Sequence, residues 1–162
     1  MTNAEQTDLT LAWRDNMLTI GGPHIAGGPV EIHYLEAFCR PGSTDREWSQ
    51  TVIPHETCLV AADDDARRLQ LTSTLQDGVT VAHTLTTVRD EVDFRLVAHN
   101  PTDRPSQAHW GQPCIRVGPF TAAAKLFGPA PDPYEYIRKC FIVLDAQICR
   151  MPFPRRRIDP EG

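Results

Sequence analysis

The chain of 162 residues lacks the sequence features of a membrane protein or a nucleic-acid-binding protein. No segment approaches the roughly 20 consecutive apolar residues that span a bilayer. The formal net charge of −5 gives no electrostatic basis for binding nucleic acid, which requires a basic face. The one basic run, residues 155–157, lies in a proline-rich tail and is typical of a solvated terminus. The sequence therefore predicts no nucleic-acid partner and no membrane.

Targeting signals, paired cysteine motifs and cofactor motifs are also missing. The N-terminus has neither the basic start nor the apolar core of a secretory signal, and the five cysteines are an odd number with no CxxC pair. This pattern favours reduced thiols in a reducing compartment, so we expect a cytoplasmic protein. There is no G-x-S-x-G motif, and prolines interrupt the glycine-rich residues 21–29 where a phosphate loop needs N–H donors. We therefore expect no cofactor.

Helical periodicity is almost absent, whereas apolar and polar residues often alternate. In residues 68–75, 79–88 and 92–99 every second side chain is mostly apolar, the signature of half-buried strands. Short turns at residues 76–78 and 89–91 separate these segments. The three segments predict an antiparallel meander.

Other parts of the sequence also favour β-structure. Four further segments are typical of strands or hairpins: residues 9–20, 30–38, 51–62 and 139–151. We expect Pro54 at a bulge or edge, because proline cannot donate to a β-ladder. Residues 118–133 predict a surface excursion with one helical turn around 122–126. The prediction is an all-β protein, an antiparallel β-sandwich over residues 1–150 followed by a Pro/Arg-rich tail at 151–162.

One stretch resembles a known family. The residues that carry the resemblance are DGV at 77–79, Val81, DFRL at 93–96, NPTD at 100–103 and Pro105. This progression is similar to one in the galactose mutarotase-like family, where it runs through the middle of a large β-supersandwich. The resemblance covers roughly residues 69–117. It implies a concave sheet that faces a sugar, as in the aldose epimerases, lyases and sugar-binding domains of that superfamily.

The chain departs from the epimerases of that family in two ways. They place a catalytic histidine on the strand after this turn and a glutamate base much further on. His109 is near the expected position but out of register with it, and a supersandwich needs considerably more than 162 residues. The resemblance therefore implies a truncated or minimal, supersandwich-like version. Its exposed sheet edges would favour a homo-oligomer.

Trp110, His109 and Gln112 are the first candidate site. Sugar sites combine an aromatic platform for C–H faces with planar polar groups for hydroxyls. This short segment offers both, with Trp110 and Gln112 on the same face of the strand by alternation. The alternative is that Trp110 is a core residue and His109 a rim residue.

Glu36, Arg40 and His55 are the second group of candidates. Glu36 lies in a mostly apolar strand, where an unpaired carboxylate is costly. We therefore expect Glu36 either to form an ion pair with Arg40 that supports the following loop or to be an acid in a cleft. His55 follows the bulge expected at Pro54, and side chains beside bulges are often directed into sites. With His109, these residues give Glu36, His55 and His109 as catalytic candidates and Arg40, Trp110 and Gln112 as substrate-binding candidates.

Metal binding is not predicted, because the histidines do not have the short spacings of zinc motifs. His83 lies on an apolar strand face, so we expect it to be a core histidine bonded to a main-chain carbonyl. The sequence thus favours a protein that binds or processes a carbohydrate, by epimerase, lyase or glycosidase-like acid–base chemistry if it is an enzyme. The alternatives are a non-catalytic structural or sugar-binding sandwich and a fragment of a larger enzyme that lacks its catalytic half.

Overall fold

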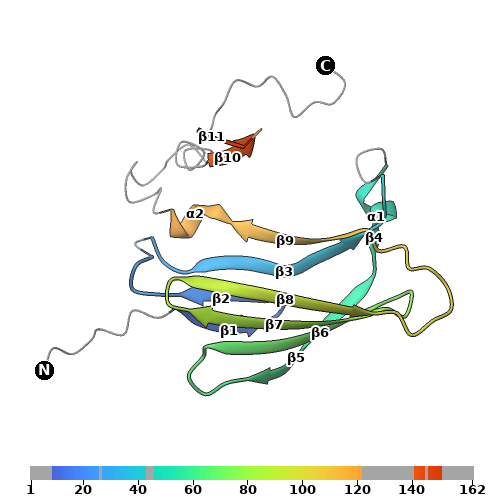
Figure 1. Ribbon diagram of the computed structural model, residues 1–162, viewed down its shortest axis with the longest axis horizontal. Coiled ribbons are helices and arrows are strands. Elements are labelled where there is room, and N and C mark those ends of the chain that lie inside the picture. The colour runs from blue at the N-terminus through green and yellow to red at the C-terminus, as the bar shows by residue number, and fades with distance from the viewer. Residues whose placement is uncertain (1–8, 26, 43–45, 122–140, 145, 151–162) are drawn as a thin grey trace, which may run out of the picture.

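A computed structural model of the chain describes residues 9–25, 27–42, 46–121, 141–144 and 146–150. Two antiparallel sheets pack against each other in a sandwich-like arrangement, and a separate hairpin follows (Figure 1). The predicted all-β, antiparallel fold is therefore confirmed.

The first sheet is built around one central strand. Its strands are β1 (Thr10–Arg14), β2 (Met17–Gly21), β3 (Val30–Cys39), β4 (Val52–Ile53) and β9 (Trp110–Arg116). Strand β3 pairs with β2 and β4 along one edge and with β9 along the other. The predicted turn between β1 and β2 is confirmed, because Asp15 and Asn16 both have positive φ, of 51° and 60°, as a type I′ hairpin requires.

The second sheet contains the predicted three-stranded meander, extended by one further strand. It consists of β5 (His55–Ala62), β6 (Arg68–Leu75), β7 (Thr80–Val88) and β8 (Glu91–His99), paired in that order. The sequence predicted one strand over residues 51–62, but the chain forms β4 in the first sheet and β5 in the second. The break falls at Pro54, whose missing N–H cannot continue a ladder.

Three short elements complete the described structure. They are α1 (Trp48–Thr51), α2 (Val117–Phe120) and the hairpin of β10 (Phe141–Leu144) and β11 (Gln147–Arg150). Ala146, in the turn of this hairpin, has a φ of 61°, which confirms the predicted position of the turn. The helical turn predicted near 122–126 and the tail at 151–162 lie outside the described residues.

The core lies between the two sheets and follows the alternation of the sequence. On β6 and β7 the inward residues are buried, including Leu71 and Leu85 at 1% and 0% exposure. The opposite wall comes from the first sheet, with Leu18, Ile32 and Phe38 buried in the same cluster. The period of two in the sequence thus determined which faces meet.

Within the described residues, one side of the sandwich is only partly covered. Leu96 of β8 is paired with the buried His83, and Ile115 of β9 with the buried Ile32, so both face inward. They are nevertheless 48% and 51% exposed. Strands β8 and β9 are edge strands on the same side of the sandwich, because β1 packs on β6 and Tyr34 of β3 packs on β8. We call Leu96, Ala98 and Ile115 the open edge.

Candidate functional site

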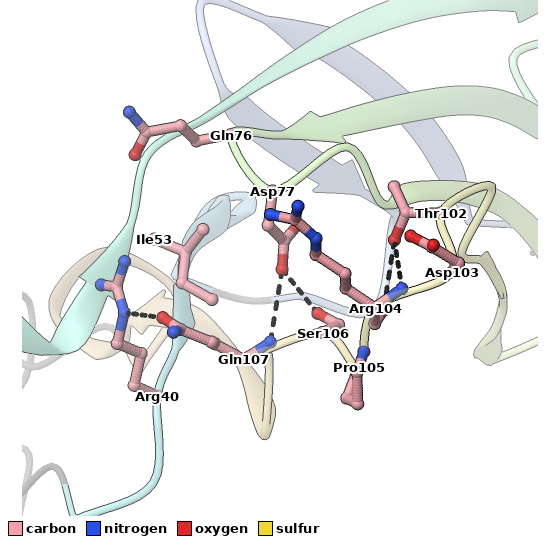
Figure 2. A pocket seen from close by; sticks show the side chains of 10 residues that line it. All are labelled: Arg40, Ile53, Gln76, Asp77, Thr102, Asp103, Arg104, Pro105, Ser106 and Gln107. Carbon is pink, nitrogen blue, oxygen red and sulfur yellow. Dashed lines mark hydrogen bonds between the residues drawn. The ribbon is translucent and has the colours of Figure 1, made fainter.

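The end of β3 and the loop after β8 enclose a cleft of about 670 Å³, which we call the loop cleft (Figure 2). Its lining residues are Arg40, Ile53, Gln76, Asp77, Thr102, Asp103, Arg104, Pro105, Ser106 and Gln107. Most of these side chains are polar, and they come from both sheets and from the loop between β8 and β9. The cleft therefore forms at the end of the sandwich, where strands give way to connections.

Asp77 fixes the loop to the turn between β6 and β7. Its Oδ2 accepts hydrogen bonds from Ser106 Oγ at 2.7 Å and from the Gln107 main-chain N–H at 3.3 Å, as Figure 2 shows. Its Oδ1 accepts from the Val79 N–H at 3.3 Å. Burial alone would raise the pKa of Asp77, but the hydrogen bonds, with that from Ser106 the largest, outweigh it and lower the pKa. Asp77 is therefore an ionised anchor.

Asn100 organises the first half of the same loop. Its Oδ1 accepts hydrogen bonds from the Thr102 N–H at 3.0 Å and from Thr102 Oγ1 at 2.7 Å, and its Nδ2 donates to the Arg104 carbonyl at 2.7 Å. These bonds form an Asx-type turn in the NPTDRP segment. The loop is thus held by side-chain hydrogen bonds at both of its halves.

Arg40 forms the opposite wall of the loop cleft. Its Nε donates to Gln107 Oε1 at 2.7 Å, and its Nη1 donates to the Val52 carbonyl at 2.7 Å. The predicted ion pair between Glu36 and Arg40 does not form. Residues four apart along a strand are about 13 Å apart, and Glu36 Oε2 instead accepts from Gln112 Nε2 at 2.8 Å.

A second hollow of about 420 Å³ adjoins the loop cleft. It is lined by Arg40, Pro41, Arg46, Ser106, Gln107, Ala108 and His109. Arg40, Ser106 and Gln107 belong to both cavities, so they form the wall between them. We call this second cavity the basic hollow.

The structure does not bring the six sequence-predicted site residues together. They lie at the cavities, on and beside β9, and, for His55, between β5 and the first sheet. Arg40 and His109 lie at the cavities. Trp110 and Gln112 are half-buried on one face of β9, with Glu36 bonded to Gln112, and line neither cavity. The predicted catalytic and binding roles of these residues stay predictions.

His55 is partly buried and lies at neither cavity. Its Nε2 lies 3.2 Å from the Leu35 carbonyl oxygen and its Nδ1 lies 3.4 Å from that of Ile53. Its ring packs edge-on against Phe38, with ring centroids 5.0 Å apart. A neutral imidazole carries one N–H, so it donates to one of these two carbonyls at a time, and both contacts hold the ring against the first sheet.

A chain of buried hydroxyl and imidazole groups crosses the core. His83 Nδ1 lies 3.0 Å from Tyr34 Oη, His83 Nε2 lies 2.9 Å from Ser73 Oγ, and Ser73 Oγ lies 2.8 Å from Thr57 Oγ1. His83 is therefore the predicted core histidine, but its partners are hydroxyls and not a main-chain carbonyl. Burial, and then the charge of His55, lower its pKa to about 4, and burial raises the pKa of Tyr34 to about 12.

Sequence reasoning missed most of the loop cleft. Residues 76–78 and 100–105 were interpreted as turns and as part of the family resemblance, and none was named as a site residue, because turn residues and binding residues share the same polar types. The density of polar side chains at two strand ends was the available signal. Within the described residues there is no group of three or more His, Cys, Asp and Glu side chains that could hold a metal ion, and no helix with the length and apolar character of a membrane span.

Comparisons of the chain with models of known protein families, with curated proteins and with solved structures found no match. The resemblance to the galactose mutarotase-like family therefore depends on the sequence pattern alone.

Proposed function

We propose that this protein binds a carbohydrate in the loop cleft. The observation that carries the proposal is the set of polar groups that line the cleft: guanidinium, carboxylate, amide and hydroxyl groups, on a loop that Asp77 and Asn100 hold in place. Sugar hydroxyls donate and accept at once, and they pair well with such planar, fixed groups. A pre-ordered loop lowers the entropic cost of binding.

The apolar part of the lining also suits a sugar. Ile53 and Pro105 line the cleft between the polar groups, and a sugar ring presents C–H faces beside its hydroxyls. Gln107 Oε1 accepts a hydrogen bond from Arg40 Nε. The NH₂ group of Gln107 can therefore donate to a ligand hydroxyl. The proposal does not use Trp110, because it lines neither cavity.

We propose carbohydrate binding and no catalytic reaction. Both carboxylate oxygens of Asp77 are occupied by hydrogen bonds within the protein. Glu36 and His55 line neither cavity. An acid and a base that share a substrate must both reach it, and these candidates do not meet at one cavity.

Replacing Gln107 by Ala is expected to weaken sugar binding about fivefold, the effect of losing one hydrogen bond of about 1 kcal/mol. Amide chemical shifts of ¹⁵N-labelled protein, followed during titration with neutral monosaccharides, measure both affinity and location. In the wild type the shifts should concentrate in residues 76–77 and 102–107. The matched control Gln70→Ala, on β6 and outside both cavities, should leave the affinity unchanged. Shifts that are absent, or that occur elsewhere, would refute the proposal.

The open edge supports a second candidate function, association with further β-structure. Leu96 and Ile115 face inward yet are about half exposed, and uncovered apolar surface beside edge strands favours association. The nearest source of such structure in a purified sample is a second copy of the chain.

Replacing Leu96 by Lys is expected to shift the wild-type protein from a concentration-dependent oligomer to a monomer, because the charge would be buried in the contact. Sedimentation velocity at several concentrations measures this. Val97→Lys is the control, because Val97 is on the same strand, faces outward and is 67% exposed. A wild type that is monomeric throughout, or equal effects of the two variants, would contradict this second candidate.

A further inference from the structure

The basic hollow carries an excess of positive charge that the loop cleft does not. Its lining includes two guanidinium groups, Arg40 and Arg46, and the exposed imidazole of His109, with no carboxylate. The loop cleft, in contrast, contains Asp77 and Asp103 beside its arginines. The two adjoining cavities are therefore electrostatically different.

The two arginines of the hollow are oriented by neutral groups. Arg46 donates from Nη2 to the Pro41 carbonyl at 2.6 Å and from Nε to the Gly42 carbonyl at 3.2 Å. Arg40 donates to the main-chain carbonyls of Val52 and Gln50 and to the Gln107 amide oxygen. In the part of the chain that the structure describes, no carboxylate lies within ion-pair distance of either guanidinium. Carbonyl oxygens fix the direction of a guanidinium but leave its charge in place.

Gly42 allows this arrangement. It has a φ of +70°, and a Cβ atom at this position would lie 2.9 Å from Arg46 Nη2. A side chain there would meet the guanidinium and would also strain the backbone. Glycine at position 42 therefore leaves room for the Arg46 guanidinium to reach the Pro41 and Gly42 carbonyls.

We infer that the carbohydrate is an acidic one, whose carboxylate or phosphate group binds in the basic hollow while its hydroxyls bind in the loop cleft. The inference rests on the proposed carbohydrate function and narrows its ligand class. Arg40, Ser106 and Gln107 line both cavities, so one ligand can reach across this shared wall. Guanidinium groups pair with carboxylate and phosphate in a planar, two-bond geometry that neutral sugars cannot offer.

Isothermal titration calorimetry with glucuronate, glucose 6-phosphate, glucose and inorganic phosphate tests the inference. One of the two acidic sugars should bind at least about tenfold more tightly than glucose, equivalent to about 1.4 kcal/mol, and added salt should reduce this advantage. Which acidic sugar binds better separates a carboxylate from a phosphate ligand.

Two variants localise the effect. Arg46→Gln and His109→Gln should each reduce affinity for the acidic sugar severalfold to tenfold and leave that for glucose unchanged. His109 is exposed and its side chain has no hydrogen bond in the described structure, so its variant is expected to fold. Arg14→Gln and His99→Gln are the matched controls, since both residues are exposed and neither lines a cavity.

The outcomes separate this inference from the function on which it rests. Equal affinity for glucose and both acidic sugars would overturn the inference and leave carbohydrate binding intact. Inorganic phosphate binding as tightly as glucose 6-phosphate would also overturn it, because the sugar would then contribute nothing. If no sugar binds, neutral or acidic, the proposed function itself fails.

Discussion

Acidification from pH 7 to pH 4 is expected to lower the free energy of unfolding by about 3 kcal/mol through His83 alone. This side chain is 1% exposed and lies between the hydroxyls of Tyr34 and Ser73. A neutral imidazole offers one donor and one acceptor, which suits a hydroxyl on each side. A protonated ring would place a charge in the core, near His55, without a counter-ion.

The sign follows from the two pKa values. Burial lowers the pKa of His83 from 6.5 to about 4 in the folded protein, so between these values the unfolded chain binds a proton that the folded protein does not. The contribution of His83 to stability is therefore complete above pH 6.5 and is lost as the pH falls toward 4. The pKa of Asp77 is lowered from 3.8, so the contribution of Asp77 to stability is lost mainly below pH 4, outside this window.

Urea unfolding at several pH values measures the effect, with His83→Gln as the test variant. Glutamine also offers a donor and an acceptor but does not titrate, so its stability should change less between pH 6.5 and 4 than that of the wild type. His99→Gln removes an exposed histidine and should retain the wild-type dependence. Identical pH profiles for the wild type and His83→Gln would show that His83 does not exclude a proton.

The core of the fold could be predicted from the sequence because it depends on local alternation. Leu71 and His83 were placed inward by the period of two, and the paired strands bury both. The exposure of Leu96 could not be predicted in this way. Alternation determines the face of a strand, but cover depends on how far the opposite sheet extends, and the first sheet leaves the inner face of β8 partly open.

The candidate site was predictable only in part. Arg40 and His109 were identified from residue type near strand ends, and both line a cavity. The hydrogen bond between Asp77 and Ser106 joins positions 29 residues apart, so no local pattern could reveal it. The expected ion pair between Glu36 and Arg40 does not form, because the spacing of residues along a strand separates the two side chains. Glu36 also lies within a register irregularity of β3, between His33 and Ala37.

Replacing Asp77 by Ala is expected to release the loop and reduce sugar affinity at least about thirtyfold, equivalent to about 2 kcal/mol. Three donors, Ser106 Oγ and the N–H groups of Gln107 and Val79, would lose their acceptor. Hydrogen bonds to a charged group each contribute about 1.5–3 kcal/mol, and water replaces part of this at a half-buried site. Stability should therefore fall by about 2 kcal/mol while the sheets remain.

Hydrogen exchange at the Gln107 amide gives a direct reading of the anchor, together with the sugar titration. The amide should be protected in the wild type and exchange freely in Asp77→Ala, while the amides of β6 and β7 stay protected. Asp77→Asn should lie between them, because Oδ1 can still accept from Val79 but an NH₂ group cannot accept from Ser106 or Gln107. Asp90→Ala, which removes an exposed carboxylate from the next hairpin turn, is the matched control. A protected Gln107 amide together with undiminished affinity in Asp77→Ala would mean that the loop holds its shape without the carboxylate, and the cleft would then need another anchor.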